Sequence, residues 1–284
     1  MKVESFFDGY TFTYTYIVYD EKSLDCVIID PVSDYQINRS TLSYESADKL
    51  AKFIDEKNLR VHLLLETHIH ADHFTAAGYL KTKYPSASIC ISDQVTGVQD
   101  IFTGLYNLKL DCEKDSQFDI LVKDGQTLEA GSVTVKAIHT PGHTPACVSY
   151  LIGGDLFTGD TLFMPDQGTG RCDFPNGSAE QLYDSITELY KYRDDTKIYV
   201  GHDYGPGGRD YKCLSTIGES KKDNTMMPAG KSKDQFIEDR EKKDGGLDYP
   251  RLLFPCIQVN MVAGKLPDAE DNGMIYLKLP LTIK

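Results

Sequence analysis

The segment Thr67-His68-Ile69-His70-Ala71-Asp72-His73 is the feature that most constrains how this chain can fold. It follows directly on the apolar run Val61 to Leu65, which is typical of a buried strand. Three imidazoles and a carboxylate in so short a stretch are unfavourable to bury together unless a cation compensates them. Open α/β sheets build such sites where their strands end. The segment therefore predicts a metal site at the carboxyl end of a strand.

Three further residues of metal-ligand type each stand directly after a glycine. They are His143 after Gly142, Asp160 after Gly159 and His202 after Gly201. Glycine lets the backbone turn tightly, so side chains from distant strands can converge. We expect these three residues to join the histidine cluster. An isolated histidine is more often structural, and we interpret His62 and His139 in that way.

Alternating and helical patterns predict two α/β halves. In the first half we expect strands over Tyr10–Val18, Cys26–Ile29 and Val61–Leu65, and helices within Ser43–Lys57 and Phe74–Tyr84. In the second half we expect strands over Val133–Ile138, Val148–Ile152, Leu156–Thr158 and Lys197–Val200, and a helix capped by Ser178. Each half ends its strands in metal-type side chains. This order predicts an α/β protein built as a four-layer α/β/β/α sandwich.

The last quarter of the chain changes in composition. Gly218 to Asp244 is rich in Lys, Asp and Glu, which predicts a solvated loop and helix. Pro250 to Leu281 regains apolar residues and is expected to pack back on the body of the protein. We therefore predict that residues 1–284 form a single domain, with a C-terminal extension of about 218–284 packed on it.

Charge and cysteine usage restrict the partners and the compartment. The formal net charge of -13 opposes binding to nucleic acid or to an anionic membrane, which leaves a small molecule as the expected partner. The seven cysteines include no Cys-x-x-Cys pair, so neither a disulfide framework nor a thiolate zinc site is expected. The chain begins without the order of a signal peptide and has no apolar run long enough for a membrane span. These features favour a cytoplasmic protein, and a homodimer is among the assemblies they allow.

The spacing of the candidate ligands resembles that of the metallo-β-lactamase superfamily. The run His68-x-His70-x-Asp72-His73 is followed in order by His143, Asp160 and His202, so all seven family positions are filled. The resemblance implies the metallo-β-lactamase fold. It also implies that His68, His70 and His143 line one metal position, that Asp72, His73 and His202 line a second, and that Asp160 reaches one or bridges both.

Two further runs resemble the persulfide dioxygenase branch of that superfamily. They are Gly170-Arg-Cys-Asp-Phe174 and Gly177 to Ser185. Asp203 fits the same branch, whereas glyoxalase II enzymes commonly have Glu there. Pro250-Arg-Leu-Leu-Phe-Pro255 and Gln258-Val-Asn260 resemble its bacterial β-lactamase-like hydrolase subgroup.

This resemblance implies a persulfide dioxygenase that oxidises glutathione persulfide, or a similar small persulfide, with O₂ to sulfite and thiol. One non-haem Fe(II) per chain would be held by the catalytic residues His68, His143 and Asp160, with His70, Asp72, His73 and His202 orienting ligands or holding a second metal. Zn(II) is the alternative ion, as purified or in a hydrolase. Arg171 and Tyr204 are candidate substrate contacts. Arg171 could instead pair with Asp173, and Tyr204 could simply pack beside the site.

The main alternative is a thioester hydrolase of the glyoxalase II kind with a dinuclear metal site, because its ligand positions are the same. The loop at Arg171, the residue Asp203 and the lack of a recognisable all-helical C-terminal domain favour the dioxygenase. A non-catalytic binding module is less expected, because no ligand position has been lost.

Overall fold

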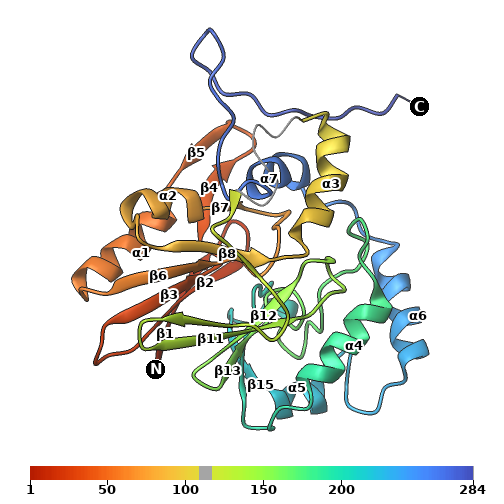
Figure 1. The fold of residues 1–284 in the computed structure, drawn as a ribbon. Coiled ribbons are helices and arrows are strands. Elements are labelled where there is room, and N and C mark those ends of the chain that lie inside the picture. Colours follow the sequence, from red (N-terminus) through yellow and green to blue (C-terminus); the bar gives the residue numbers. More distant parts are fainter. Residues whose placement is uncertain (109–116, 284) are drawn as a thin grey trace.

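The computed structural model describes residues 1–108 and 117–283, and two β-sheets with flanking helices make up most of it (Figure 1). The first sheet contains, in spatial order, β1 (Lys2–Asp8), β2 (Thr13–Tyr19), β3 (Asp25–Ile29), β6 (Arg60–Leu65), β8 (Ser88–Ser92) and β9 (Ile120–Val122). The second contains β10 (Thr127–Ala130), β11 (Val133–His139), β12 (Val148–Ile152), β13 (Asp155–Phe157), β14 (Lys197–Tyr199) and β15 (Leu214–Thr216). A small third sheet joins β5 (Thr41–Ser43), β4 (Val32–Gln36) and β7 (Phe74–Thr75).

Helices cover the outer faces of both large sheets. The described residues form α1 (Glu45–Glu56), α2 (Ala77–Lys83), α3 (Val95–Tyr106), α4 (Ala179–Leu189), α5 (Ile217–Asp223), α6 (Lys233–Asp244) and α7 (Leu253–Asn260), with a 3₁₀ turn at Pro206–Gly208. On β3, Ile28 belongs to one apolar cluster with Leu50 of α1, whereas its neighbour Val27 belongs to another with Val135 of β11. Successive side chains of a strand point to opposite faces, so one strand serves both layers. The predicted four-layer sandwich is thereby confirmed.

The strand directions bring the candidate ligands together. β3, β6 and β8 are parallel to one another, and β13 is parallel to β14. The carboxyl ends of parallel strands meet at one edge of a sheet, which is where α/β proteins place their sites. The loops after β6, β13 and β14 carry the histidine cluster, Asp160 and His202.

The strands predicted from the sequence are present, although the first begins at Thr13 and not at Tyr10, because residues 9–12 form a turn. The predicted helix from Phe74 to Tyr84 is wrong at its start. Phe74 and Thr75 form β7, which pairs with β4, and α2 begins only at Ala77. The Phe74 ring stacks on Tyr35 of β4, with ring centroids 4.4 Å apart. The backbone N–H of Thr75 donates to Oδ1 of Asn260 in α7. These contacts come from distant parts of the chain and override the local helical pattern.

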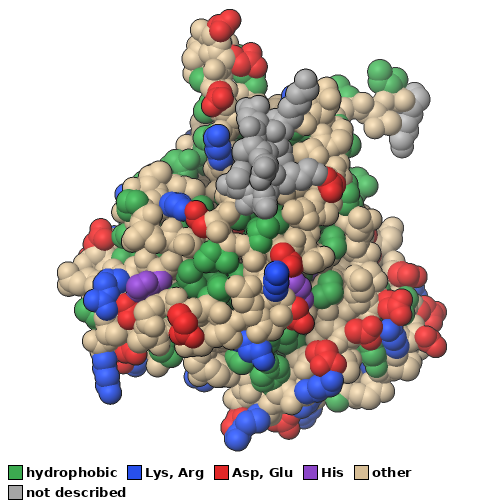
Figure 2. Space-filling model, viewed as in Figure 1, with side chains coloured by type: hydrophobic (Ala, Val, Ile, Leu, Met, Phe, Trp, Pro, Cys, Tyr) green, Lys and Arg blue, Asp and Glu red, His purple; other side chains and the backbone are tan. Residues whose placement is uncertain are grey.

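The C-terminal quarter also differs from its prediction in one respect. Gly218 to Asp244 forms α5 and α6, yet α6 is not wholly solvated, because Phe236, Arg240 and Asp244 are buried. Helix α7 contacts α3 and β7. Beyond it the chain is mostly exposed, and one loop projects from the body (Figures 1 and 2). Leu266 and Leu277 nevertheless pack beside Phe74, and the backbone of Lys278 exchanges hydrogen bonds with the Gln258 side chain. The division into a single domain with a packed extension stays a prediction.

The surface carries both acidic and basic side chains, as the composition of the sequence requires. Figure 2 shows acidic and basic side chains interleaved over the visible face. Within the described ranges, no helix has both the length and the apolar character that a membrane crossing requires. Six cysteines are free thiols, and Cys112 lies outside the described residues.

Candidate metal centre

The loop after β6 buries three of the candidate ligands. His68, His70 and His73 are each at most 2% exposed, whereas Asp72 is partly open to solvent. Asn260 of α7 holds this loop from outside by donating its Nδ2 to the backbone oxygens of His70 and His73. The loop therefore presents its side chains from a braced backbone.

The other three candidates reach the same place from the second half of the chain. His143 lies in the turn between β11 and β12, where Gly142 has φ 143° and packs so closely on α4 that a Cβ atom would lie 2.4 Å from the Leu182 nitrogen. Gly159 has φ 47° and lies against Thr67 in the same tight way. Both turns require glycine, as the sequence predicted, and they set His143 and Asp160 against the histidine loop.

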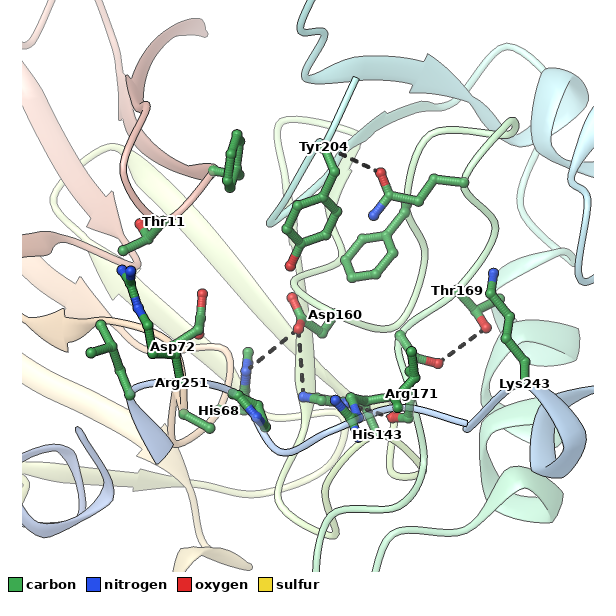
Figure 3. A pocket seen from close by; sticks show the side chains of 18 of the residues that line it. Thr11, His68, Asp72, His143, Asp160, Thr169, Arg171, Tyr204, Lys243 and Arg251 are labelled. Atoms are coloured by element: carbon green, nitrogen blue, oxygen red, sulfur yellow. Dashed lines mark hydrogen bonds and ion pairs between the residues drawn. The ribbon is translucent and has the colours of Figure 1, made fainter. Parts of the chain in front are cut away.

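His68, His143 and Asp160 form one compact group. Their ligand atoms all lie within 4.8 Å of one another. His143 Nε2 lies 3.5 Å from Asp160 Oδ2, and His68 Nε2 lies 4.0 Å from the same oxygen (Figure 3). Two imidazole nitrogens and a carboxylate oxygen at this spacing can share one metal ion.

A second group lies on the other side of Asp160. His202 Nε2 is 3.4 Å from Asp160 Oδ1 and 3.3 Å from Asp72 Oδ2. Asp72 also forms a candidate metal-holding group with His70 and His73. Asp160 thus presents one oxygen to each group.

Buried atoms without hydrogen-bond partners test whether a metal fits here. Within the described residues, His70 Nδ1, Asp72 Oδ2, His73 Nε2 and Asp160 Oδ1 are buried and make no hydrogen bond. A buried polar atom left in this state is destabilising. These four belong to the predicted ligand set, so the residues present fit a metal ion.

In two of these histidines, His143 and His70, the ring nitrogen that does not face the metal position contacts another group of the protein. His143 Nδ1 donates to the backbone oxygen of Arg171 at 2.6 Å, which leaves Nε2 free for a metal. His70 Nε2 lies 3.1 Å from Asp30 and 3.2 Å from Glu66. Hydrogen bonds of this kind fix the ring orientation of metal ligands.

Burial and charge shift the histidine pKa values in opposite directions. Burial and the neighbouring histidines hold the pKa of His68 well below its usual range. Burial also lowers the pKa of His70, but Asp30 and Glu66 outweigh it and raise that pKa. His68 is therefore neutral, as a metal ligand must be.

A cavity of about 650 Å³ opens onto this centre. His68, Asp72, His143 and Asp160 line it, whereas His70, His73 and His202 lie behind them. The volume is in the range of small-molecule sites. Any molecule in this cavity meets the His68, His143 and Asp160 group directly.

The two predicted substrate contacts also line the cavity, with different surroundings. Arg171 donates through Nε and Nη2 to the carboxylate of Asp173 and through Nη1 to the backbone oxygen of Asp248. Its donors thus brace the loop. Tyr204 is half-exposed, and its hydroxyl points toward Asp160 (Figure 3). Partial burial and the charges of Asp72 and Asp160 raise the pKa of Tyr204, so its hydroxyl stays protonated.

Several residues of the centre were not predicted from the sequence. Asp30 and Glu66 anchor His70, Thr13 contacts His202, and Asn260 holds the loop. The stop of a strand at Asp30-Pro31 and the position of Glu66 before the cluster were visible signals. Arg251 lies in the run Pro250–Pro255 that resembled a subgroup of the family, and Lys243 carried no local signal, yet both line the cavity. His62 and His139 lie outside the centre, where His62 pairs with Asp25 and His139 contacts the Val122 backbone oxygen.

Known proteins resemble this chain over most of its length. The model of the metallo-beta-lactamase superfamily matches residues 9–202. A probable metallo-hydrolase of Burkholderia pseudomallei is 44% identical over 99% of both chains. A protein named glyoxylase B2 of Dictyostelium discoideum is 46% identical over 99% of this chain and 97% of its own. The human mitochondrial persulfide dioxygenase ETHE1 is 32% identical over 86% of this chain and 81% of its own. The crystal structure of ETHE1 from Myxococcus xanthus has a TM-score of 0.75 and 32% identity, and it covers 93% of this chain and 100% of that one.

Proposed function

The chain belongs to the metallo-β-lactamase superfamily, and we propose that it acts there as a persulfide dioxygenase. The proposed substrate is glutathione persulfide or a similar small persulfide, which O₂ and water convert to the thiol and sulfite. The proposal rests on the likeness to ETHE1 proteins and on the way the centre faces its cavity. A cytoplasmic location and a homodimer stay predictions.

The observation that carries the proposal is the unequal exposure of the two ligand groups. His68, His143 and Asp160 face the cavity together, whereas the second group reaches it only through Asp72. A two-histidine, one-carboxylate face with open positions is typical of non-haem Fe(II) oxygenases. We therefore propose these three residues as the ligands of one Fe(II) and as the catalytic centre.

The persulfide sulfur would give up the four electrons that reduce O₂, and iron would supply the redox chemistry that passes them on, which zinc cannot do. The residues of the chain do the rest. The backbone oxygen of Arg171 holds the His143 ring in place, and Asp30 holds Thr67 and His70. Tyr204 directs a hydroxyl toward Asp160, from where it can donate to a sulfur or an oxygen in the cavity. Of the two interpretations of Arg171, the loop brace matches its present bonds, and a direct contact with substrate stays a prediction.

The second group gives a specific reason to keep a hydrolase as the other candidate. Asp72 Oδ2, His73 Nε2 and Asp160 Oδ1 are buried atoms without hydrogen bonds, and Asp160 Oδ1 lies 3.4 Å from His202 Nε2. These atoms would suit a second ion. A dinuclear centre could activate water against a glutathione thioester, as in the glyoxalase II alternative.

The experiment that separates the two functions uses the same protein with two metals. Anaerobic loading with Fe(II) is followed by measuring O₂ uptake and sulfite release with glutathione persulfide. In parallel, Zn(II)-loaded protein is given S-lactoylglutathione. We expect O₂ uptake and sulfite in equal amounts. Thioester hydrolysis without O₂ consumption would overturn the dioxygenase.

Substitutions then locate the metal. Asp160→Asn should abolish sulfite production and lower the bound iron measured by elemental analysis. His73→Gln should leave one iron per chain if a single ion is held by His68, His143 and Asp160. His139→Gln serves as the control, because this histidine lies outside the centre. Equal loss of iron in His73→Gln and Asp160→Asn would contradict the single-ion assignment.

A further inference from the structure

A second cavity, of about 270 Å³, lies beside the metal cavity, and we call it the side cavity. Both cavities are lined by Ala71, His143, Arg171 and Pro250. A wall one side chain thick therefore separates them at these residues. The rest of the lining comes from α3, the loop after Arg171, the start of α7 and the C-terminal segment.

A row of three rings follows the wall of the side cavity outward from the metal ligand His143. The centroid of the His143 ring lies 6.4 Å from that of Phe174, and the Phe174 centroid lies 5.5 Å from that of Phe102. Phe102 is buried, whereas Leu105, one turn further along α3, is half-exposed. The side cavity therefore leads from the surface to the ring of His143 along an apolar wall.

The charged and polar groups nearest His143 are already engaged within the protein. Arg171 bonds the carboxylate of Asp173 and the backbone oxygen of Asp248. His143 directs Nδ1 to the Arg171 backbone oxygen and Nε2 toward Asp160, so its ring carbons are left to face the side cavity. An anion that entered here would lose its hydration without gaining a partner, which is costly. The side cavity suits a small, uncharged, apolar molecule.

We propose that the side cavity binds O₂ and supplies it to the metal centre through the wall at Ala71 and His143. This inference rests on the proposed function, in which a persulfide anion occupies the larger cavity. O₂ is apolar, and transfer of an apolar molecule from water to an apolar space is favourable. Apolar cavities in proteins stay dry and take up uncharged guests such as xenon.

The arrangement gives the two reactants separate entrances. The wall is thinnest at Ala71, whose side chain is a single methyl group, and side-chain rotations on the picosecond to nanosecond scale open such a wall to a diatomic gas. The persulfide anion is excluded from the side cavity by its charge. O₂ therefore reaches His143 without passing the persulfide that fills the larger cavity.

Dissolved O₂ is itself the probe that tests the proposal, because it is paramagnetic and speeds the relaxation of nearby nuclei. Protein with isotope-labelled leucine methyl groups is loaded with Zn(II) and studied by NMR under O₂ and under argon. We expect a larger effect of O₂ at Leu253, in the side cavity, than at the equally buried Leu63. Likewise, Leu105 should respond more than Leu214, which lines neither cavity and is exposed to a similar degree, 45% against 48%. Equal effects within both pairs would overturn the proposal.

Filling the side cavity tests the supply of O₂. In Fe(II)-loaded Leu105→Trp we expect the KM for O₂ to rise several-fold while the KM for the persulfide stays unchanged. Leu214→Trp is the matched control. The chain contains no tryptophan, so a shift of the emission to shorter wavelength reports directly that the introduced ring lies in an apolar space.

A second substitution narrows the same space from its buried end. Leu253→Phe should raise the KM for O₂ in the same way, whatever position the larger ring takes in Leu105→Trp. An unchanged KM for O₂ in Leu253→Phe would contradict the proposal, and so would a rise in the KM for the persulfide alone. Unfolding midpoints show whether each variant keeps its fold.

The outcomes separate this inference from the proposed function. The Zn(II)-loaded protein does not oxidise persulfide, so the relaxation pattern needs no turnover. If that pattern is found and the Fe(II)-loaded protein consumes no O₂, the O₂ site stands and the dioxygenase fails. If O₂ is consumed with release of sulfite but the leucine pairs respond equally, the dioxygenase stands and the O₂ site fails.

Discussion

Replacing Arg240 by Met should destabilise the protein more than any surface change of equal size. The guanidinium is 2% exposed and bonds both oxygens of Asp244, which is itself 5% exposed. Methionine keeps most of the apolar stem but leaves the Asp244 charge buried, with the backbone N–H of Cys172 as its remaining donor. Removing one partner of a buried ion pair generally costs about 3–5 kcal/mol. For a chain of this size that corresponds to a fall in Tm of roughly 5–8 °C.

The effect should reach the metal centre as well. Arg240 also bonds the backbone oxygens of Thr169 and Gly170, one residue before the Arg171 carbonyl that holds His143. We therefore expect Arg240→Met to weaken metal binding in addition to stability. Competition with a chromogenic chelator measures this.

Urea unfolding followed by circular dichroism gives the free energy of unfolding, and a second variant identifies the cause. In Arg240→Met with Asp244→Leu no charge stays buried, so at least half of the lost stability should return. Lys242→Met, on the exposed side of the same helix, is the control. A loss below about 1 kcal/mol in Arg240→Met, or no recovery in the double variant, would refute the reasoning.

Three further predictions concern other parts of the fold. Ser178→Ala removes the hydroxyl that accepts from the Gln181 N–H at the start of α4, so urea unfolding should show a loss of about 1 kcal/mol, whereas Ser178→Thr should stay near wild type. Gly142→Ala would place a Cβ atom 2.4 Å from the Leu182 backbone nitrogen, so we expect loss of folded protein and of bound metal. Gly97→Ala, with open space around it, should be neutral or stabilising by thermal melting. Burial alone would raise the pKa of Asp25, but hydrogen bonds from His62, Ser132 and Arg60 hold that pKa below its usual range. The difference in free energy of unfolding between wild type and Asp25→Asn should therefore be at its full value above about pH 5. It should shrink as the pH falls below about 4. A difference independent of pH would contradict this.

The layered fold was predictable because it depends on short-range patterns. Val61 to Leu65 and Val148 to Ile152 are apolar runs of strand length, and Ala47, Leu50 and Ile54 repeat at helical spacing. β7 was not predictable, because Phe74 and Thr75 leave the helical pattern only in contact with Tyr35 and Asn260. The buried side of α6 was hidden for a similar reason, since Arg240 counts as a surface residue until Asp244 and Thr169 surround it.

The candidate ligands were predictable because metal-type residues cluster or follow glycines along the chain. The residues that hold these ligands in place were not predictable. Asp30 and Glu66 meet His70 through the packing of β3 beside β6. Arg251 and Lys243 face the metal ligands only because α6 and the start of α7 fold over the cavity. Such contacts depend on tertiary structure, and no spacing in the sequence records them.

The two hydrogen bonds from Asn260 to the histidine loop link the order of synthesis to metal acquisition. His68, His70 and His73 leave the ribosome long before Asn260, yet their loop gains its outer brace only when α7 docks. A nascent chain stopped short of Asn260 can already contain every predicted ligand while its loop is still loose. Tight retention of a metal is therefore expected to come late in biosynthesis, after the C-terminal quarter has folded over the finished sheets.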